Sequence, residues 1–124
     1  MAVCAGLWSR EIARRAGANI PLIPSFHQYM VTEPIEGIVS DMPGIRDPDR
    51  LTYFKEEVGG LAAGGYELNP IPYDGEPSVD DPEFRLFPEM TEHFAQFMPG
   101  MVERFPQLET VGIKRWFKIG RAHV

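Results

Sequence analysis

The pattern of apolar and polar positions predicts both helices and strands, and its most regular part is a late helix. Apolar residues recur there at the i, i+3, i+4, i+7, i+8 and i+11 spacing of one helix face: Phe94, Phe97, Met98, Met101, Val102 and Phe105. Pro99 lies inside this pattern and predicts a kink or a restart after a broken first turn. Pro106 ends the helix.

A shorter helix is predicted near the beginning of the chain. Trp8, Ile12 and Ala16 recur at four-residue spacing, Gly17 is a suitable residue to follow the helix, and Pro21 prevents its continuation. The apolar run before this helix, "MAVCAGLW", is too short for an ordinary strand. We expect it to be the end of a strand whose beginning lies outside the chain.

The first strand is predicted in "SFHQYMVT", which is rich in β-branched and aromatic residues and lies between prolines. Alternation divides its side chains between two faces, with His27, Tyr29 and Val31 on one, and Phe26, Gln28 and Met30 on the other.

A hairpin is predicted in "LTYFKEEVGGLAAGGYEL". We expect strands over 51–57 and 61–67, joined by a turn at the glycine pair 59–60. The second glycine pair, 64–65, leaves bare backbone, which indicates either a bulge or a very close neighbour. Tyr53, Lys55 and Glu57 share one face of the first hairpin strand.

The remaining segments are predicted to be mostly irregular. The turn-rich stretch 36–50 reads as a connection, and the proline-rich stretch 68–90 as an irregular surface segment. "ETVGIKRWF" is then predicted to form a last strand.

The final seven residues, "KIGRAHV", show no cap, turn or alternation that completes this strand. They can be back-translated as AAG ATC GGA AGA GCA CAC GTC, which matches a common sequencing-library adapter read in frame. We therefore interpret residues 118–124 as an adapter-derived tail.

Composition narrows the possible functions. The chain has 124 residues, 44% of them hydrophobic, which is enough for the core of one domain. Its formal net charge of −6 argues against binding to nucleic acid or to an anionic membrane, because both require a cationic surface. No apolar run approaches the roughly 20 residues of a membrane helix, and no signal peptide is recognisable. Cys4 is the single cysteine, so we expect no intrachain disulfide and a cytoplasmic setting.

Few residues offer chemistry on their own. A lone histidine on a strand, such as His27, is more often structural than catalytic, although an imidazole titrates near neutral pH and can accept a proton. Tyr53 is equally well explained as a cross-strand aromatic or as a pocket residue. His93 and His123 form no metal-ligand spacing with the other candidates, so no metal site is expected.

Four segments in one order carry a resemblance to a known family: "CAGLWSREIARRAG", "FHQYMVTEPIEG", "YFKEEVGGLAAGGYE" and "PQLETVGIKRWF". Together they resemble the FAD-dependent amine oxidoreductases of the D-amino-acid-oxidase type, most closely the dimethylglycine and sarcosine dehydrogenase branch. The resemblance covers residues 2–117.

The resemblance implies an α+β fold, with a mixed, largely antiparallel substrate-domain sheet and packed helices, as a fragment of a two-domain flavoprotein. Residues 1–19 would end a strand of the flavin-binding domain and form the next helix, and residues 20–117 would belong to the substrate domain. The cofactor would be FAD, with Cys4, Ala5, Gly6 and Trp8 along it, since small residues before a helix let backbone amides face a pyrophosphate. From the residues alone, Gly6 also fits an ordinary strand-to-helix turn.

The resemblance also implies that His27 and Tyr53 border the substrate pocket, as candidate catalytic residues. The reaction would be oxidation of a small N-methylated amino acid, dimethylglycine or sarcosine, by hydride transfer to flavin. Tetrahydrofolate could bind through a C-terminal domain that this chain does not contain. Other substrates of the superfamily remain open, namely a D-amino acid, glycine or a polyol phosphate, as does a non-catalytic binding module.

A dinucleotide-binding strand followed by G-x-G-x-x-G is missing from the chain, and "GGLAAGG" has the wrong spacing. The asparagine-glycine segment and the later glycine-containing loop that follow "RWF" in the family are also missing. We therefore predict an internal fragment that is inactive by itself and binds FAD poorly.

Overall fold

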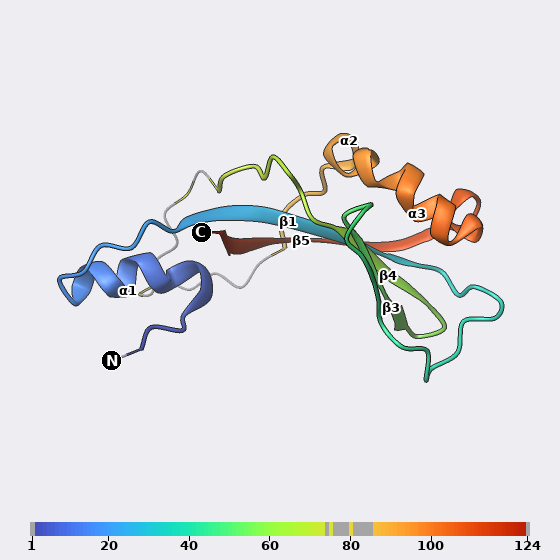
Figure 1. Cartoon of the computed structure of the whole chain (residues 1–124), viewed down its shortest axis with the longest axis horizontal. Helices are drawn as coiled ribbons and strands as arrows, with labels where there is room; N and C mark the ends of the chain where they lie inside the picture. Colours follow the sequence, from blue (N-terminus) through green and yellow to red (C-terminus); the bar gives the residue numbers. More distant parts are fainter. Residues whose placement is uncertain (1, 74, 76–79, 81–85, 124) are drawn as a thin grey trace. The chain divides into compact units, whose positions relative to one another are not determined.

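A computed structural model describes residues 2–73, 75, 80 and 86–123, and Figure 1 shows the course of the chain. The fold is α+β, as predicted. The helical elements are η1 (Gly6–Trp8), α1 (Ser9–Arg15), α2 (Thr91–Phe94), η2 (Ala95–Phe97), α3 (Met98–Arg104) and η3 (Pro106–Glu109). The strands are β1 (Ile23–Thr32), β2 (Ile45–Asp47), β3 (Thr52–Glu57), β4 (Gly60–Gly65) and β5 (Ile113–His123). Among the described residues, no helix is long and apolar enough to cross a membrane.

The chain divides into two compact units. The first contains residues 1–27, 69–86 and 119–124, and the second contains residues 28–68 and 87–118. The predicted division at residue 19/20 is not tested by this partition, because it concerns the domains of a longer protein. Each unit is described by itself below.

In the first unit, the predicted early helix is present and ends as expected. Gly17 has a φ of +76°, and its N–H and that of Ala18 donate to the carbonyls of Arg14 and Ala13 at 3.0 and 2.8 Å. This pair of bonds is the Schellman motif, which favours glycine because its residue takes a left-handed conformation. The predicted Trp8, Ile12 and Ala16 stripe is not the buried face, since Ala16 is exposed and the buried helix residues are Ser9 and Ala13.

The beginning of β1 is held by the irregular segment that follows residue 68. Phe26 N–H donates to the carbonyl of Ile71, and Tyr73 N–H donates to that of Pro24, at 2.9 and 2.8 Å. The rings of Phe26 and Tyr73 meet edge to face at 5.5 Å between centroids. Arg15 on α1 pairs with Asp80, with Nη2 to Oδ2 at 2.5 Å. A segment predicted to be irregular therefore still makes specific backbone bonds.

The sheet has the strand order β2-β3-β4-β1-β5. The pairs β2/β3, β3/β4 and β4/β1 are antiparallel. Met30 lies opposite Ala63, and Ala63 lies opposite Phe54, so these three residues share one face. The other face carries the neighbouring residues of each strand, as the two-residue period of a strand requires.

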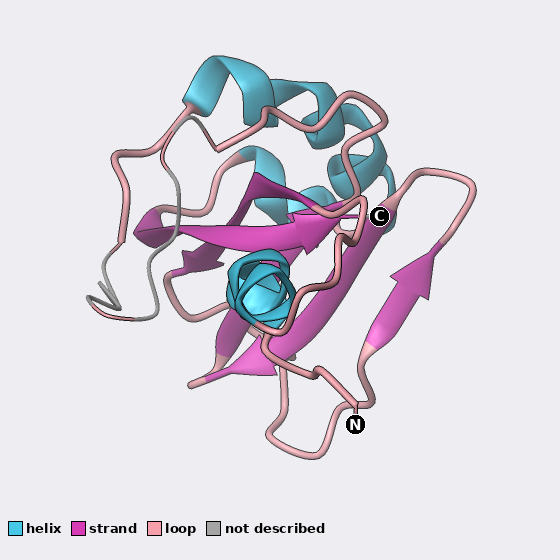
Figure 2. Ribbon diagram, turned by 90° about the vertical axis from the view of Figure 1, so that its left-hand side faces the viewer, coloured by secondary structure: helices cyan, strands magenta, loops and turns pink. Residues whose placement is uncertain are grey.

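The first of these faces carries the core of the second unit, with α2, η2 and α3 over it (Figure 2). Phe94, Phe97 and Met101 are between 0 and 4% exposed and pack with Met30, Phe54 and Ala63. The predicted apolar stripe is thus confirmed as core. Pro99 occupies the first turn of α3, where its missing N–H costs nothing, so the helical segment restarts at Met98 instead of kinking.

The hairpin is confirmed, but its turn is one residue earlier than predicted. Val58 and Gly59 have φ angles of +52° and +78°, and β4 already begins at Gly60. Two positive φ angles define the tight turn whose twist suits a two-residue hairpin. The sequence suggested the glycine pair 59–60, because a β-branched valine is disfavoured in this conformation.

The stretch 36–50 is not only a connection, because it contains the three-residue strand β2. Ile45, Arg46 and Asp47 pair with Phe54, Tyr53 and Thr52. The strand is short and adjoins turn residues, so its sequence carries no alternation long enough to reveal it. Strand β5 also differs from expectation, since it continues through residue 123 into the segment interpreted as adapter-derived.

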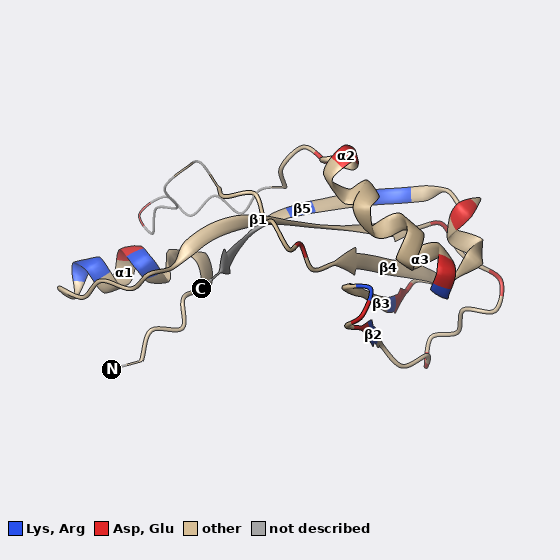
Figure 3. Cartoon of the chain, turned by 45° about the horizontal axis from the view of Figure 1, so that its top comes forward, with Lys and Arg blue, Asp and Glu red and all other residues tan. Residues whose placement is uncertain are grey.

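Asp47 joins the end of β2 to α3, and Figure 3 shows acidic and basic residues along these elements. Its side chain is 4% exposed and accepts from Arg104 Nε at 2.5 Å. It also accepts from the N–H groups of Asp49 and Arg50 at 3.2 Å each, which closes the turn between β2 and β3. Arg50 in turn pairs with Glu103 on α3. The hydrogen bond from Arg104 holds the pKa of Asp47 below its ordinary value.

We predict that Asp47→Asn lowers the free energy of unfolding and flattens its dependence on pH. Because the pKa of Asp47 is depressed in the folded state, its contribution is present above its unfolded pKa and is lost as pH falls through the folded pKa. Urea unfolding between about pH 7 and pH 3 should therefore show a steeper loss of stability for the wild type than for the variant. Asp41→Asn, at an exposed carboxylate, should keep the wild-type slope. Parallel curves for wild type and Asp47→Asn would contradict this role.

We predict that Gly65→Ala destabilises the second unit by about 1–3 kcal/mol, the usual cost of overpacking. A Cβ at Gly65 would overlap the ring of Phe97 in the core. Gly44→Ala is the matched control, because its Cβ would meet only the Phe54 carbonyl oxygen at 3.7 Å. Chemical denaturation of both variants should separate them, and equal effects would be inconsistent with a close approach at Gly65.

Candidate functional site

The face of the sheet opposite the core carries a row of aromatic and cationic residues, all of them in the second unit. Register places Arg46 opposite Tyr53, Tyr53 opposite Gly64, and Gly64 opposite Tyr29. The sequence predicted which residues share a strand face with Tyr29 and which with Tyr53, but not that these two tyrosines lie in one row. Only the register of the folded sheet brings them together.

Stacking between side chains connects this row. The Tyr29 and Phe117 rings are nearly parallel, at 4.8 Å between centroids and 8° between planes. The Arg115 guanidinium lies over the Phe117 ring, 4.8 Å from its centroid. At the other end, Arg46 lies 4.6 Å from the Tyr66 centroid, and Tyr66 in turn contacts Tyr53. The face therefore offers π-surfaces together with guanidinium groups, a combination suited to small polar ligands with an apolar part.

Tyr53 lies directly over Gly64. A Cβ at position 64 would overlap the phenol ring and oxygen of Tyr53. Close approach, one of the two explanations offered for the glycine pair 64–65, is thus the correct one on this face, as Gly65 and Phe97 show on the other. Tyr53 is both a cross-strand aromatic and a residue whose position depends on a glycine. Lys55, on the same face, is exposed.

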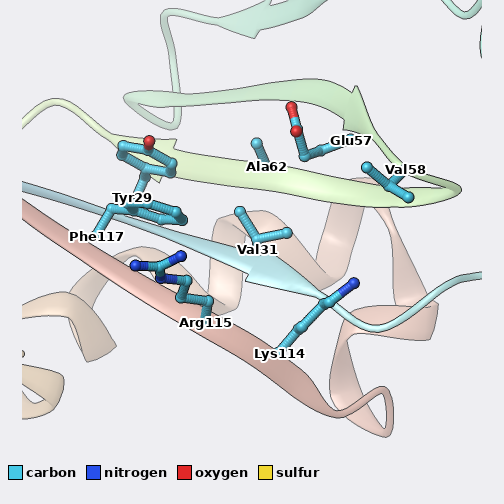
Figure 4. Close-up of a pocket in the computed structure, with 8 residues that line it drawn as sticks. All are labelled: Tyr29, Val31, Glu57, Val58, Ala62, Lys114, Arg115 and Phe117. Carbon is cyan, nitrogen blue, oxygen red and sulfur yellow. The ribbon is translucent and has the colours of Figure 1, made fainter.

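A pocket opens beside this row (Figure 4). Its volume is about 360 Å³, and its lining residues come from β1, the β3–β4 hairpin and β5: Tyr29, Val31, Glu57, Val58, Ala62, Lys114, Arg115 and Phe117. Sequence reasoning placed Tyr29, Val31 and Glu57 on suitable faces but assigned none of them to a site. It did not consider Lys114 or Arg115, because the pairing of β5 cannot be read from the sequence.

His27 is buried, with 6% of its surface exposed, and belongs to the first unit. Tyr53 belongs to the second unit, so no common site is assigned to this pair. The catalytic roles expected for both residues remain predictions. The prediction that His27 lies within a strand is confirmed.

Of the four residues expected along FAD, Cys4 and Ala5 lie in a segment without regular structure, and Gly6 and Trp8 lie in η1, directly before α1. Gly6 has a φ of +54°, and a Cβ there would meet no atom within 4 Å, so backbone conformation explains this glycine. The Ala5 N–H already donates to Ser9 Oγ at 3.1 Å. Cys4 is exposed. Trp8 is half-buried, and its backbone N–H donates to the Ala5 carbonyl at 3.1 Å. Helix α1 has only seven residues.

The described residues before α1 do not form a cradle that would hold FAD. The backbone N–H of Ala5 is already bonded to Ser9, and no close approach requires Gly6. The cofactor roles of Cys4, Ala5, Gly6 and Trp8 therefore remain predictions, and we assign no chemical step to them. The described residues also hold no cluster of three metal-binding side chains.

Comparison with known proteins identifies the family. The family model of the FAD dependent oxidoreductases matches residues 1–118. The chain is 43% identical over 111 residues to mitochondrial sarcosine dehydrogenase of Homo sapiens, covering 90% of this chain and 12% of that relative. It is 39% identical over 66 residues to mitochondrial dimethylglycine dehydrogenase of Rattus norvegicus, covering 51% of this chain and 8% of that protein. It is also 33% identical over 113 residues to the mitochondrial regulatory subunit of pyruvate dehydrogenase phosphatase of Mus musculus, covering 89% of this chain and 13% of that protein.

The fold and these matches identify a family of flavoproteins. The chain belongs to the DAO family of FAD dependent oxidoreductases. It spans roughly an eighth of the length of sarcosine dehydrogenase. The names of these relatives place them in mitochondria, whereas the cytoplasmic setting expected from the sequence is not tested.

We predict that Gly64→Ala displaces Tyr53 and costs about 1–3 kcal/mol of stability. In a Tyr53→Ala background the same substitution should cost less than about 1 kcal/mol, because the overlapping ring is gone. A double-mutant cycle by urea unfolding measures this coupling directly. Equal costs of Gly64→Ala in the two backgrounds would show that Tyr53 does not depend on Gly64.

Proposed function

We propose that this chain is the substrate-side portion of an FAD-dependent dehydrogenase that oxidises a small N-methylated amino acid, sarcosine or dimethylglycine. The observation that carries the proposal is the 43% identity to human sarcosine dehydrogenase across 90% of the chain. FAD would supply the redox chemistry of this oxidation as the acceptor of a hydride, and no described residue is assigned to hold it. Any tetrahydrofolate-binding domain would lie outside the chain.

His27 is proposed to act on the substrate amine or carboxylate. A neutral imidazole can accept a proton from an ammonium group, and either ring nitrogen can donate a hydrogen bond to a carboxylate when protonated. Its burial at 6% exposure supports a defined orientation. Strand β1 provides a rigid frame around His27, which suits a residue that positions a small substrate.

Tyr53 is proposed as a second pocket residue. Its phenol lies over the backbone of Gly64, where no side chain competes for space. The contact between Tyr53 and Tyr66 limits the motion of the ring. A phenol held in this way can donate one hydrogen bond to a substrate carboxylate at a fixed place.

We predict that His27→Ala, in a parent protein restored at both ends, lowers turnover of sarcosine or dimethylglycine by about 100-fold, as expected when a group active in proton transfer is lost. Tyr53→Phe should raise KM more than it lowers kcat, because it removes a binding hydrogen bond. His93→Ala, at a histidine on α2 for which no role is proposed, is the matched control. Steady-state kinetics, with the flavin content of each variant measured by absorbance, would test both roles.

Unchanged kinetics of His27→Ala at full flavin content would remove His27 from the mechanism. Activity on a D-amino acid, glycine or a polyol phosphate, without activity on N-methylated amino acids, would move the protein to another branch of the family. The control variant should keep wild-type kcat and KM within a factor of about two.

A non-catalytic module is the second candidate function. It is supported by the similarity to a relative named as a regulatory subunit, which covers 89% of this chain. A restored parent that binds no flavin and lacks an upstream G-x-G-x-x-G segment would favour this function over the dehydrogenase.

A further inference from the structure

The pocket of about 360 Å³ beside Tyr29 is not explained by the function proposed above. Neither His27 nor Tyr53 lines it. All of its lining residues belong to the second unit, so it is formed entirely within one compact part of the chain. Its volume lies near the lower end of the roughly 300–1,000 Å³ typical of ligand pockets, which suits a small molecule.

The charges around the pocket are separated by sign. Glu57 lies at the end of β3, on the hairpin side, whereas Lys114 and Arg115 lie on β5 (Figure 4). In the described part of the chain, no ion pair joins Glu57 to either cation. A carboxylate and two cations therefore face one small space without neutralising each other by direct contact.

Arg115 is held in a suitable orientation for binding an anion. Its guanidinium lies over the Phe117 ring, and Phe117 stacks on Tyr29. Stacking uses the flat face of the guanidinium and leaves the N–H groups at its edge available to a carboxylate. Lys114, the preceding residue of β5, also lines the pocket, but its side chain extends away from Arg115, toward the hairpin end (Figure 4).

The space between the charges is apolar. Val31 and Ala62, paired across β1 and β4, lie between the acidic and the basic side (Figure 4). Val58 completes the hairpin side and is 74% exposed. It also has a φ of +52°, a conformation that costs a β-branched residue energy and that asparagine or glycine would adopt more easily. A strained valine with an exposed side chain is understandable where that side chain forms the wall of a binding site.

We propose that this pocket binds a small zwitterion whose amine and carboxylate are separated by a short apolar chain. The carboxylate contacts Arg115, the ammonium contacts Glu57, and the methylene groups lie on Val31, Ala62 and Val58. A simple anion would leave Glu57 unpaired beside it, and a simple amine would meet two cations. Opposite charges at the two ends of the ligand match both sides of the pocket, and this site is separate from the residues proposed for the flavin reaction.

Binding can be measured on the 124-residue chain by NMR, from the methyl signals of Val31, Val58 and Ala62. 6-Aminohexanoate should shift these signals and bind up to about fivefold more tightly than hexanoate or hexylamine, since each of these has one charged end and one ion pair is worth up to about 1 kcal/mol. Glycine, whose charges are too close together to reach both sides, should bind more weakly. Equal binding of hexanoate and 6-aminohexanoate, or no shift with any of them, would overturn the proposal.

Two variants test the assignment of residues. Glu57→Gln should weaken binding of 6-aminohexanoate about fivefold and leave hexanoate unaffected or improved, whereas Glu109→Gln, at an exposed acid on η3, should change neither. Val58→Asn should raise the free energy of unfolding, because asparagine adopts the conformation of this turn residue more easily. It should also weaken binding of 6-aminohexanoate, because it removes an apolar wall of the pocket. A stable Val58→Asn chain with wild-type affinity, or a Glu57→Gln chain with wild-type preference, would overturn the proposed contacts.

Discussion

The structure of the second unit depends on the bare backbone of Gly64 and Gly65 in the middle of the sheet. Successive residues of a strand face opposite sides, so two adjacent glycines expose the backbone on both faces. Phe97 of η2 lies against Gly65 on one side, and Tyr53 lies against Gly64 on the other. The same dipeptide therefore sets how closely the helices pack on the core and where a candidate site residue is placed.

The edge strand β2 is stabilised mainly by the ionic and hydrogen-bonding contacts of Asp47. β2 has only three residues, which is too few for stable pairing by itself. Asp47 compensates through its bonds to the following turn and to Arg104, which link the edge strand to α3. Loss of this carboxylate would weaken a part of the sheet that the apolar core does not reach.

The two faces of the sheet have different roles. One face is closed by helices and excludes water, so its residues serve stability. The other carries stacked aromatic rings, guanidinium groups and a pocket, and its residues are available for binding. An antiparallel sheet permits this division because only one of its faces must be buried.

The sequence by itself determined the local elements whose signals are strong. These were the Phe and Met stripe of the late helix, its interruption at Pro99, the strand around His27, the glycine after α1 and the existence of the hairpin. Periodicity and proline chemistry act within a few residues, so they can be read without a fold. Four ordered segments also pointed to the family, which the comparison confirmed. Tertiary structure decided the rest, because it depends on pairing between distant residues: the strand β2, the turn at Val58 and Gly59, the contact of Tyr53 with Gly64, and the pocket that joins Glu57 to Lys114 and Arg115. The register of neighbouring strands is the physical reason, since a shift of one residue would turn every one of these side chains to the opposite face.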